Sequence, residues 1–374
     1  MKTPYLEIDL SKVQGNAEQL VAMAGAKGID ITGVTKSVLG NPRIAACLVA
    51  AGISSLGDSR LENIVRMKTA DIKAPFVLIR TPTVGEAHDV VENVDVSFNS
   101  ELVVIAELSR EAIRQHTTHD IVLMVEMGDL REGVPVRDLA KTIEAIQFMD
   151  GIRLKGLGMN LACMNGVKPS QANMALFSDL AEKYEKQHGL LFHIISGGNS
   201  ANIQWMEKVD SPGRINTVRL GESIFIGRET ISQQHIKGLH LNAITLVAEV
   251  IESKIKPSRP KGDIGLDAFG QAPVFEDKGD MLRSIVALGK QDVTVAGLTP
   301  LMDVDIIGSS SDHIVLDSTR APLQVGDRVS FGLDYAALLS SMTSPFVANN
   351  YIQPSTDTWC ILNNSFAEGL STWG

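Results

Sequence analysis

The sequence contains few cysteines, and their spacing does not suggest a cysteine-based site. There are three, Cys47, Cys163 and Cys360, and no two of them form a C-x-x-C pair. An odd, widely spaced set argues against a disulfide framework and against a cysteine zinc site. We therefore expect reduced thiols and no bound metal.

Long apolar runs are also missing. No stretch approaches the roughly 18 apolar residues of a membrane span, and the amino terminus has no apolar segment of the signal-peptide type. Basic residues are fewer than acidic ones: the chain has 34 Lys and Arg and 44 Asp and Glu, so its formal net charge is −10. Such a charge attracts neither nucleic acid nor an anionic membrane. These absences favour a cytoplasmic enzyme that acts on a small molecule.

Residues 11–235 show eight short apolar segments that alternate with helix-like segments. This count and order are typical of a (β/α)8 barrel, a TIM barrel. An open doubly wound sheet is the alternative, and the lack of a G-x-G-x-x-G motif after the first strand weakens it. The expected strands are 31–36, 53–58, 76–81, 95–98, 121–126, 154–159, 191–195 and 217–219. The expected helices are 42–51, 60–70, 84–92, 101–115, 137–149, 171–187 and 201–208.

The pattern changes after residue 235. Residues 236–350 carry short apolar runs separated by Gly, Pro, Asp and Ser, which predicts an all-β domain. We expect the strand at residues 1–10 to join this C-terminal β domain, and we assign no structure to the polar tail at 351–374. The expected strands are 243–251, 284–288, 293–296, 304–307, 313–316 and 328–332, with one helix at 335–342.

Lys36 stands where the first barrel strand meets the next helix. The residues before it are of the buried-strand type, and its neighbours in sequence include no carboxylate. Burial without a countercharge lowers the pKa of a lysine, and the neutral amine can form a Schiff base. A solvated surface charge is the plainer alternative. In a barrel the carboxyl ends of the strands carry the chemistry, which favours a reactive lysine.

Two turns near the end of the barrel suggest a phosphate site. The segment Ser196-Gly197-Gly198-Asn199-Ser200 follows the seventh strand, and Gly221 follows the eighth. Glycine-rich backbone before a helix lets N–H groups approach an anion, and these two loops hold phosphate in many barrels. A flexible turn would have a similar composition. We call the end of the barrel where the strands have their carboxyl ends the barrel mouth. A phosphate site and a reactive lysine there together suggest pyridoxal 5′-phosphate.

The motifs taken together resemble a known family. The chain is similar to the alanine-racemase-like pyridoxal phosphate enzymes (fold type III), and most of all to the ornithine racemase group of predicted amino-acid racemases. That resemblance covers residues 4–351 and implies a TIM barrel followed by a β domain. The motifs are G-V-T-K (33–36), S-L-G-D-S-R-L-E-N (55–63), G-D-L-R-E-G-V (128–134), S-G-G-N-S (196–200), R-L-G-E (219–222), G-L-D-A-F-G (265–270), S-S-D-H (310–313) and M-T-S-P (342–345).

The resemblance implies a set of cofactor contacts. Lys36 would carry the cofactor and act as one catalytic base, and Arg219 would face the pyridine nitrogen. Because an arginine stays charged, that nitrogen would remain unprotonated, which favours reprotonation at Cα over side reactions. Asn160 stands where alanine racemases have a histidine against the ring, and Tyr335 matches a tyrosine that approaches the phosphate. The residues placed around the phosphate are Ser196, Gly197, Asn199, Ser200, Gly221 and Glu222, the last two through backbone amides.

The sequence offers several candidates for the second catalytic base. Alanine racemases use a tyrosine in an I-G-Y segment, whereas Ile264-Gly265 is followed here by Leu266. We prefer His313, because a histidine needs little pKa tuning near neutral pH. Tyr335 is the alternative, and lesser candidates are Asp267 and Cys163.

The resemblance also implies a substrate and a partner. Arg131 would bind the substrate carboxylate, and the acidic groups suited to a distal ammonium are Asp267, Asp312, Asp129 and Glu222, with Ser311 beside them. We expect an ornithine racemase that works as a homodimer, with the second subunit completing each active site. Lysine, alanine or broad specificity are alternatives, as are a D-amino-acid aldolase (lyase) and a non-catalytic pyridoxal phosphate carrier.

Overall fold

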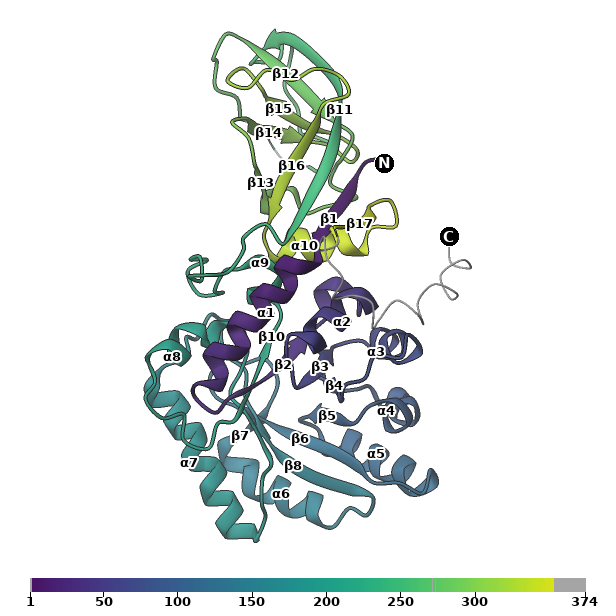
Figure 1. Ribbon diagram of the computed structural model, residues 1–374, viewed down its shortest axis with the longest axis vertical. Coiled ribbons are helices and arrows are strands. Elements are labelled where there is room, and N and C mark those ends of the chain that lie inside the picture. Colours follow the sequence, from purple (N-terminus) through teal and green to yellow (C-terminus); the bar gives the residue numbers. More distant parts are fainter. Residues whose placement is uncertain (1, 271, 273, 353–374) are drawn as a thin grey trace. The chain divides into compact units, whose positions relative to one another are not determined.

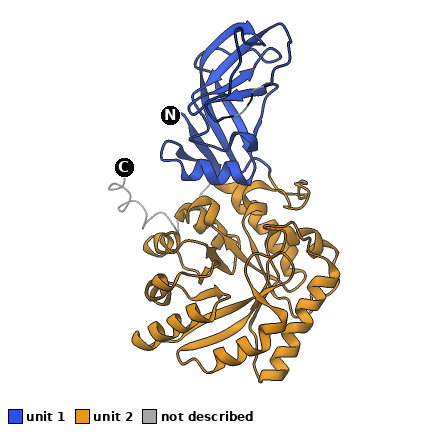
Figure 2. Ribbon diagram, turned by 180° about the vertical axis from the view of Figure 1, so that it is seen from behind, with its two compact units in different colours: residues 1–9, 241–352 blue, residues 10–240, 353–374 orange. Residues whose placement is uncertain are grey.

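The computed structural model describes residues 2–270, 272 and 274–352. Contacts divide these residues into two compact units (Figure 2). We call residues 10–240 the barrel unit and residues 2–9 with 241–352 the β unit. Cys360 and the predicted tail from residue 353 onward lie outside the described residues.

The barrel unit contains a closed parallel barrel of eight strands (Figure 1). The strand order is β5-β4-β3-β2-β10-β9-β8-β6, and pairing of β5 with β6 closes the ring. The predicted TIM barrel is therefore confirmed. The strands are β2 (Asp30–Val34), β3 (Ser55–Asp58), β4 (Phe76–Leu78), β5 (Val96–Asn99), β6 (His119–Glu126), β8 (Ile152–Gly158), β9 (Ile194–Ser196) and β10 (Thr217–Leu220), and the short β7 (Val134–Pro135) pairs with β6.

Helices connect these strands in the order that the sequence predicts. They are α2 (Pro42–Ala50), α3 (Leu61–Thr69), α4 (Ala87–Asn93), α5 (Leu102–Arg114), α6 (Leu139–Gln147), α7 (Gln171–His188) and α8 (Ile203–Lys208). Two helices were not predicted, α1 (Leu10–Gly25) and α9 (Glu222–Ile226). The buried apolar residues of α1 do recur every three or four positions, at Leu10, Val13, Ala17 and Leu20. Gly15 and Asn16 have low helix propensity and obscured this period.

The β unit is built on a mainly antiparallel sheet in the order β13-β16-β11-β12-β15-β14. The strand β1 pairs antiparallel with β11 and parallel with β17. The helix α10 (Tyr335–Thr343) follows β16. The strands are β1 (Tyr5–Asp9), β11 (Ile244–Pro257), β12 (Asp280–Val286), β13 (Leu298–Pro300), β14 (Asp305–Ser309), β15 (Ile314–Asp317), β16 (Arg328–Leu333) and β17 (Ala348–Ile352), the last of which was not predicted.

The strand predicted at 293–296 is wrong. Residues Val295–Gly297 form a 3-10 helix, and β13 begins only after it. The backbone of this segment bonds to α10 and to the residue before it, because Thr294 N donates to Ser340 Oγ at 2.8 Å and Gly297 O accepts from Asp334 N at 2.9 Å. These tertiary contacts override the local apolar pattern.

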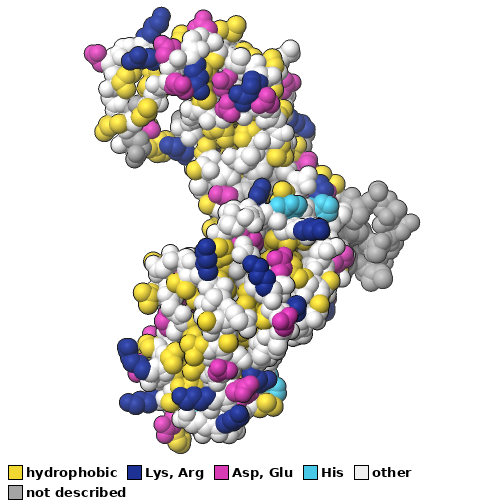
Figure 3. All heavy atoms as spheres, turned by 90° about the vertical axis from the view of Figure 1, so that its left-hand side faces the viewer, with side chains coloured by type: hydrophobic (Ala, Val, Ile, Leu, Met, Phe, Trp, Pro, Cys, Tyr) yellow, Lys and Arg dark blue, Asp and Glu magenta, His cyan; other side chains and the backbone are white. Residues whose placement is uncertain are grey.

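Charged residues of both signs are interspersed on the face that Figure 3 shows. No large field of one sign is visible there, in keeping with a net charge that is moderate for 374 residues. None of the helices in the described residues combines the length and the apolar character that crossing a membrane would require.

Candidate active site

Lys36 begins a short 3-10 helix, Lys36–Val38, directly after β2. The residue before it anchors this turn, because Thr35 N donates to Gly57 O at 2.9 Å and Thr35 Oγ1 donates to Asp58 Oδ2 at 2.7 Å. Asp58 ends β3 and is fully buried, and it also accepts a hydrogen bond from Asn63 Nδ2 at 3.0 Å. The neighbouring strand therefore fixes the backbone that carries the lysine.

Gly40 closes the same turn and must be a glycine. Its φ is +59°, and a Cβ there would lie 2.6 Å from Asn63 O. The close approach excludes a side chain, and the left-handed conformation favours glycine as well. The turn is thus packed against α3 as well as against β3.

The Lys36 amine lies among several ionisable groups. Burial is the main cause that lowers its pKa; Arg131 and Arg219 lower it further, whereas Cys163 and Asp58 oppose the shift. The structure thus brings Lys36, Arg131 and Arg219 into electrostatic range of one another. It also adds a buried carboxylate, Asp58, that the local sequence around Lys36 did not reveal. A lowered pKa leaves more neutral amine at neutral pH, as Schiff-base chemistry requires.

Arg219 lies on β10, next to β2, and only 5% of it is exposed. Its guanidinium donates to Ser196 Oγ, to Met159 O at 2.8 Å and to Asn160 Oδ1 at 3.2 Å. The ring of Phe98 lies beneath it, with 4.9 Å between the guanidinium carbon and the ring centroid. Burial lowers the pKa of Arg219 to about 10, so the group stays protonated at neutral pH.

Asn160 and Asn199 form a second polar layer beside Arg219. Asn199 Nδ2 donates to Asn160 Oδ1 at 3.0 Å and to Leu161 O at 2.9 Å. Asn160 Nδ2 is buried and has no hydrogen-bond partner within the described part of the chain. A buried donor without a partner is costly, so this atom indicates the position of a bound polar group.

The two loops predicted to hold phosphate lie side by side. Ser223 N donates to Ser200 Oγ at 3.2 Å, and the two hydroxyls are 3.1 Å apart. Within the residues that the structure describes, the N–H groups of Gly198, Ser200 and Gly221 donate to no other backbone group. A Cβ on Gly221 would lie 2.8 Å from Val34 O, so only glycine allows this approach. Three available N–H groups suit an anion such as phosphate.

The other residues predicted at the phosphate have different contacts. Ser196 is fully buried and its hydroxyl accepts from Arg219. Gly197 N donates to Thr217 O, and a Cβ on Gly197 would lie 2.7 Å from Ile215. Glu222 is the first residue of α9, and its carboxylate accepts from Thr230 and Gln233.

Arg131 and Cys163 meet across the loops that follow β6 and β8. Arg131 Nη1 lies 2.7 Å from Cys163 Sγ, and the rest of the guanidinium pairs with Glu132. Glu132 holds the pKa of Arg131 above its ordinary value in spite of burial. Asp129 was a candidate for the substrate ammonium, but it is 1% exposed and accepts hydrogen bonds from the backbone of the β8 loop.

Ser311, Asp312 and His313 lie in the β unit, in the turn before β15. Asp312 accepts from Gln291 Nε2 and from Ser311 Oγ, the latter at 2.8 Å. His313 is exposed, and its Nδ1 lies 3.3 Å from Ser310 Oγ. The His313 imidazole is therefore accessible at the surface of the β unit.

Asp267 lies in the segment between β11 and β12, and Tyr335 is the first residue of α10. Asp267 Oδ1 accepts from Phe269 N at 2.9 Å. The Lys290 ammonium lies 3.6 Å from the centroid of the Phe269 ring, and Lys290 N donates to Ser310 O at 2.9 Å. The segment of Asp267 is thus tied to the turn that carries Asp312 and His313.

The residues of the barrel mouth fit pyridoxal 5′-phosphate. Lys36 provides an amine with a lowered pKa, Arg219 provides a buried cation for the ring nitrogen, and the unpartnered Nδ2 of Asn160 requires a polar neighbour. The N–H groups of Gly198 and Gly221 can bind the phosphate. Each part of the cofactor therefore meets a suitable group of this chain.

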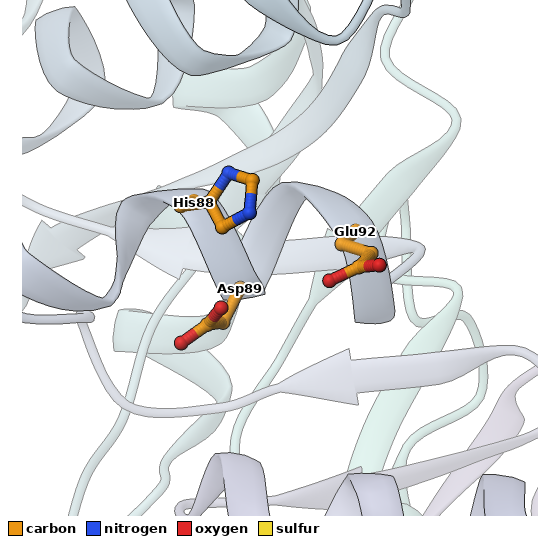
Figure 4. A group of neighbouring side chains, drawn as sticks. All are labelled: His88, Asp89 and Glu92. Carbon is orange, nitrogen blue, oxygen red and sulfur yellow. The ribbon is translucent and has the colours of Figure 1, made fainter.

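One group of potential metal ligands occurs among the described residues: His88, Asp89 and Glu92 on α4 (Figure 4). Their ligand atoms lie within 4.8 Å of one another, and all three residues are exposed. His88 Nδ1 already contacts Glu111 at 3.2 Å and Arg114 at 2.9 Å. Exposed acidic groups are common without a bound ion, and we assign these residues no metal-binding role.

Sequence reasoning missed two features of the site. Asp58 is the last residue of β3, and only its burial and its bond to Thr35 reveal its relation to Lys36. Phe98 supports Arg219 from β5, on the opposite side of the barrel. A signal for Asp58 did exist, since it ends a barrel strand, where functional side chains gather.

Comparisons with known proteins agree with this geometry. The family model described as alanine racemase, N-terminal domain, matches residues 8–229. A lysine racemase from Thermotoga maritima is 42% identical over 360 residues, covering 95% of this chain and 100% of the relative. An ornithine racemase from Acetoanaerobium sticklandii is 36% identical over 348 residues, covering 92% of this chain and 98% of the relative.

A solved structure shows the same fold. The alanine racemase from Bartonella henselae with covalently bound pyridoxal phosphate superimposes with a TM-score of 0.71 at 16% identity, covering 94% of this chain and 100% of that one. The match of the family model extends over more than half of the chain, and the two curated relatives match almost all of it. The chain therefore belongs to the alanine racemase family of pyridoxal 5′-phosphate-dependent amino-acid racemases.

Proposed function

We propose that this racemase interconverts the L- and D-forms of a diamino acid, lysine or ornithine. The observation that carries the proposal is the near-complete match to two curated relatives, one named for lysine and one for ornithine. Sequence reasoning favoured ornithine. Because the lysine racemase has the higher identity, 42% against 36%, we give both substrates equal standing.

Lys36 would hold the cofactor and move a proton to and from Cα on one face of the substrate. Its lowered pKa favours the neutral amine, the form that attacks a carbonyl and accepts a proton. Pyridoxal 5′-phosphate supplies the electron withdrawal that makes the Cα proton acidic. Arg219 would keep the ring nitrogen unprotonated, because a protonated guanidinium can only donate to it.

Arg131 would bind the α-carboxylate of the substrate. Its guanidinium is within electrostatic range of Lys36, so a carboxylate bound there places the amino group near the lysine. The distal ammonium would bind to Asp312 or Asp267 of a second copy of the chain, which completes the active site in a homodimer. Each oxygen of Asp312 accepts one hydrogen bond and keeps capacity for another.

The second base would be His313 or Tyr335, supplied by a second copy of the chain in a homodimer. A base on the opposite face is needed because Lys36 reaches only one side of Cα. Replacing the second base should stop proton exchange from one enantiomer and leave exchange from the other. His313→Ala and Tyr335→Phe, each tested with both enantiomers in D2O, distinguish the candidates. Two-sided exchange in both variants would eliminate both residues.

The substrate is tested with single L- and D-amino acids in D2O, with deuterium at Cα and chirality as readouts. We expect lysine and ornithine to exchange and racemise, and alanine to react on the order of a hundredfold more slowly, since its small side chain gains nothing from an acidic pocket. If alanine exchanges while both diamino acids keep their proton, the diamino-acid assignment is wrong.

A further inference from the structure

The Asp129 carboxylate holds the loop that follows β8 through hydrogen bonds, and we call this set of bonds the clamp. It lies in the loop after β6, is 1% exposed, and accepts backbone N–H bonds from Cys163 at 3.1 Å, Met164 at 2.9 Å, Asn165 at 3.2 Å and Val167 at 3.3 Å. Asn165 Nδ2 also donates to Asp129 O at 2.7 Å. One buried residue thus accepts five hydrogen bonds from the neighbouring loop.

This clamp determines where Cys163 lies. The Cys163 backbone N–H is one of the four that Asp129 holds, and Cys163 Sγ lies 2.7 Å from Arg131 Nη1. Glu132 holds the guanidinium from the other side. Arg131 therefore has one neighbour from its own loop and one from the loop that Asp129 fixes.

Two residues next to the clamp have an uncommon backbone conformation. Leu130, beside Asp129, has φ +51°, and Ala162, beside Cys163, has φ +53°. This left-handed conformation is uncommon for residues other than glycine. Burial alone would raise the pKa of Asp129, but its backbone donors lower it, so the carboxylate stays ionised and keeps all four bonds.

We propose that Asp129 is a positioning residue that orients Arg131 by fixing the loop of Cys163. The inference rests on the proposed function for the role of Arg131 as the carboxylate-binding group. A free arginine side chain samples many rotamers, and holding it in one orientation lowers the cost of binding a carboxylate. Asp129 thereby acts on every amino-acid substrate, because the α-carboxylate is common to them all.

The alternative role for Asp129 is direct binding of the distal ammonium. Its two oxygens already accept four backbone bonds, which fills the usual capacity of a carboxylate. The two roles predict different results for a short substrate. Positioning raises KM for every amino acid tested, whereas ammonium binding raises it only for lysine and ornithine.

The test is Asp129→Asn in the holoenzyme, with Glu229→Gln as the matched control. Glu229 is also in the barrel unit, is 3% exposed and clamps its own loop through the N–H groups of Ile231, Ser232 and Gln234. We expect Asp129→Asn to raise KM about tenfold for lysine, ornithine and alanine alike, with kcat changed by less than about threefold. Glu229→Gln should leave KM unchanged.

Alkylation of Cys163 by iodoacetamide, followed by mass spectrometry, measures the clamp without any substrate. Asp129→Asn should change the rate of this alkylation severalfold, because a released loop moves the exposed thiol away from the Arg131 guanidinium, and Glu229→Gln should not. Cys163→Ala, which removes the contact with Arg131 but keeps the clamp, should also raise KM. Unchanged KM in Asp129→Asn and Cys163→Ala, or unchanged alkylation in Asp129→Asn, would overturn the proposal. A wild-type enzyme that racemises none of these amino acids would instead overturn the proposed function, while alkylation still reports on the clamp.

Discussion

The two ends of the barrel differ in the hydrogen-bond partners that they give to buried ionisable side chains. At the carboxyl ends of the strands, Lys36 is partly buried and Arg219 is buried, and Arg219 donates to three acceptors. At the amino end, His119 starts β6, is 2% exposed and has one side-chain partner, Ser97 Oγ at 2.8 Å. Burial lowers the pKa of His119 to about 4, although Asp120 and Asp95 oppose the shift.

The charge of each buried group depends on the hydrogen-bond acceptors around it. A buried cation persists only where acceptors compensate its lost hydration, and the mouth supplies them through Ser196, Met159 and Asn160. A single hydroxyl cannot compensate a charged imidazole, so His119 is neutral. The carboxyl end of the barrel therefore keeps a charged group in the active site, whereas the amino end contributes to stability.

The largest effect is expected at Lys36. Lys36→Ala should reduce racemisation by at least about a thousandfold, because the variant loses both the cofactor linkage and one base. It should also lose the absorbance of the bound cofactor near the edge of the visible range. Lys27, which donates to Val209 O at 2.7 Å, provides the control, and Lys27→Ala should change neither readout. Survival of both absorbance and racemisation in Lys36→Ala would refute the role of this lysine.

An intermediate effect is expected at Arg219. Arg219→Leu leaves Met159 O and Ser196 Oγ buried without their donor, which should lower the free energy of unfolding by about 2 kcal/mol. Racemisation should fall about tenfold or more, since the ring nitrogen loses its cation. Denaturant unfolding and exchange kinetics in D2O measure the two changes. A variant that loses neither stability nor rate would show that this buried charge is dispensable.

The smallest effect on activity is expected at His119. Its folded pKa of about 4 lies below the ordinary 6.5, so the unfolded chain binds a proton first as the pH falls. The stability associated with the neutral ring is therefore present above pH 6.5 and is lost between pH 6.5 and 4, by about 3 kcal/mol. Unfolding of His119→Phe should lack this component, and racemisation at neutral pH should match the wild type. Identical pH dependence in the two proteins would show that His119 does not titrate in this way.

Local sequence patterns predicted the barrel and the reactive lysine at its mouth. Alternating segments predict eight strands, and the chemistry of such a barrel gathers at the strand ends, where Lys36 follows the first strand. The family resemblance of the motifs then singled out Arg131 and Arg219. Their place follows from local pattern and from the parallel order of the strands. The same reasoning missed α1, whose apolar spacing is interrupted by small and polar residues.

How these side chains are held follows only from the folded chain. Asp58 is 22 positions beyond Lys36, and Asp129 is 34 positions before Cys163, yet the pairing of neighbouring strands and loops brings each pair together. Interactions across such distances in sequence depend on which strands and loops meet, and no local pattern encodes that. The sequence therefore identified the reactive groups, and the fold gave them their burial, their partners and their pKa.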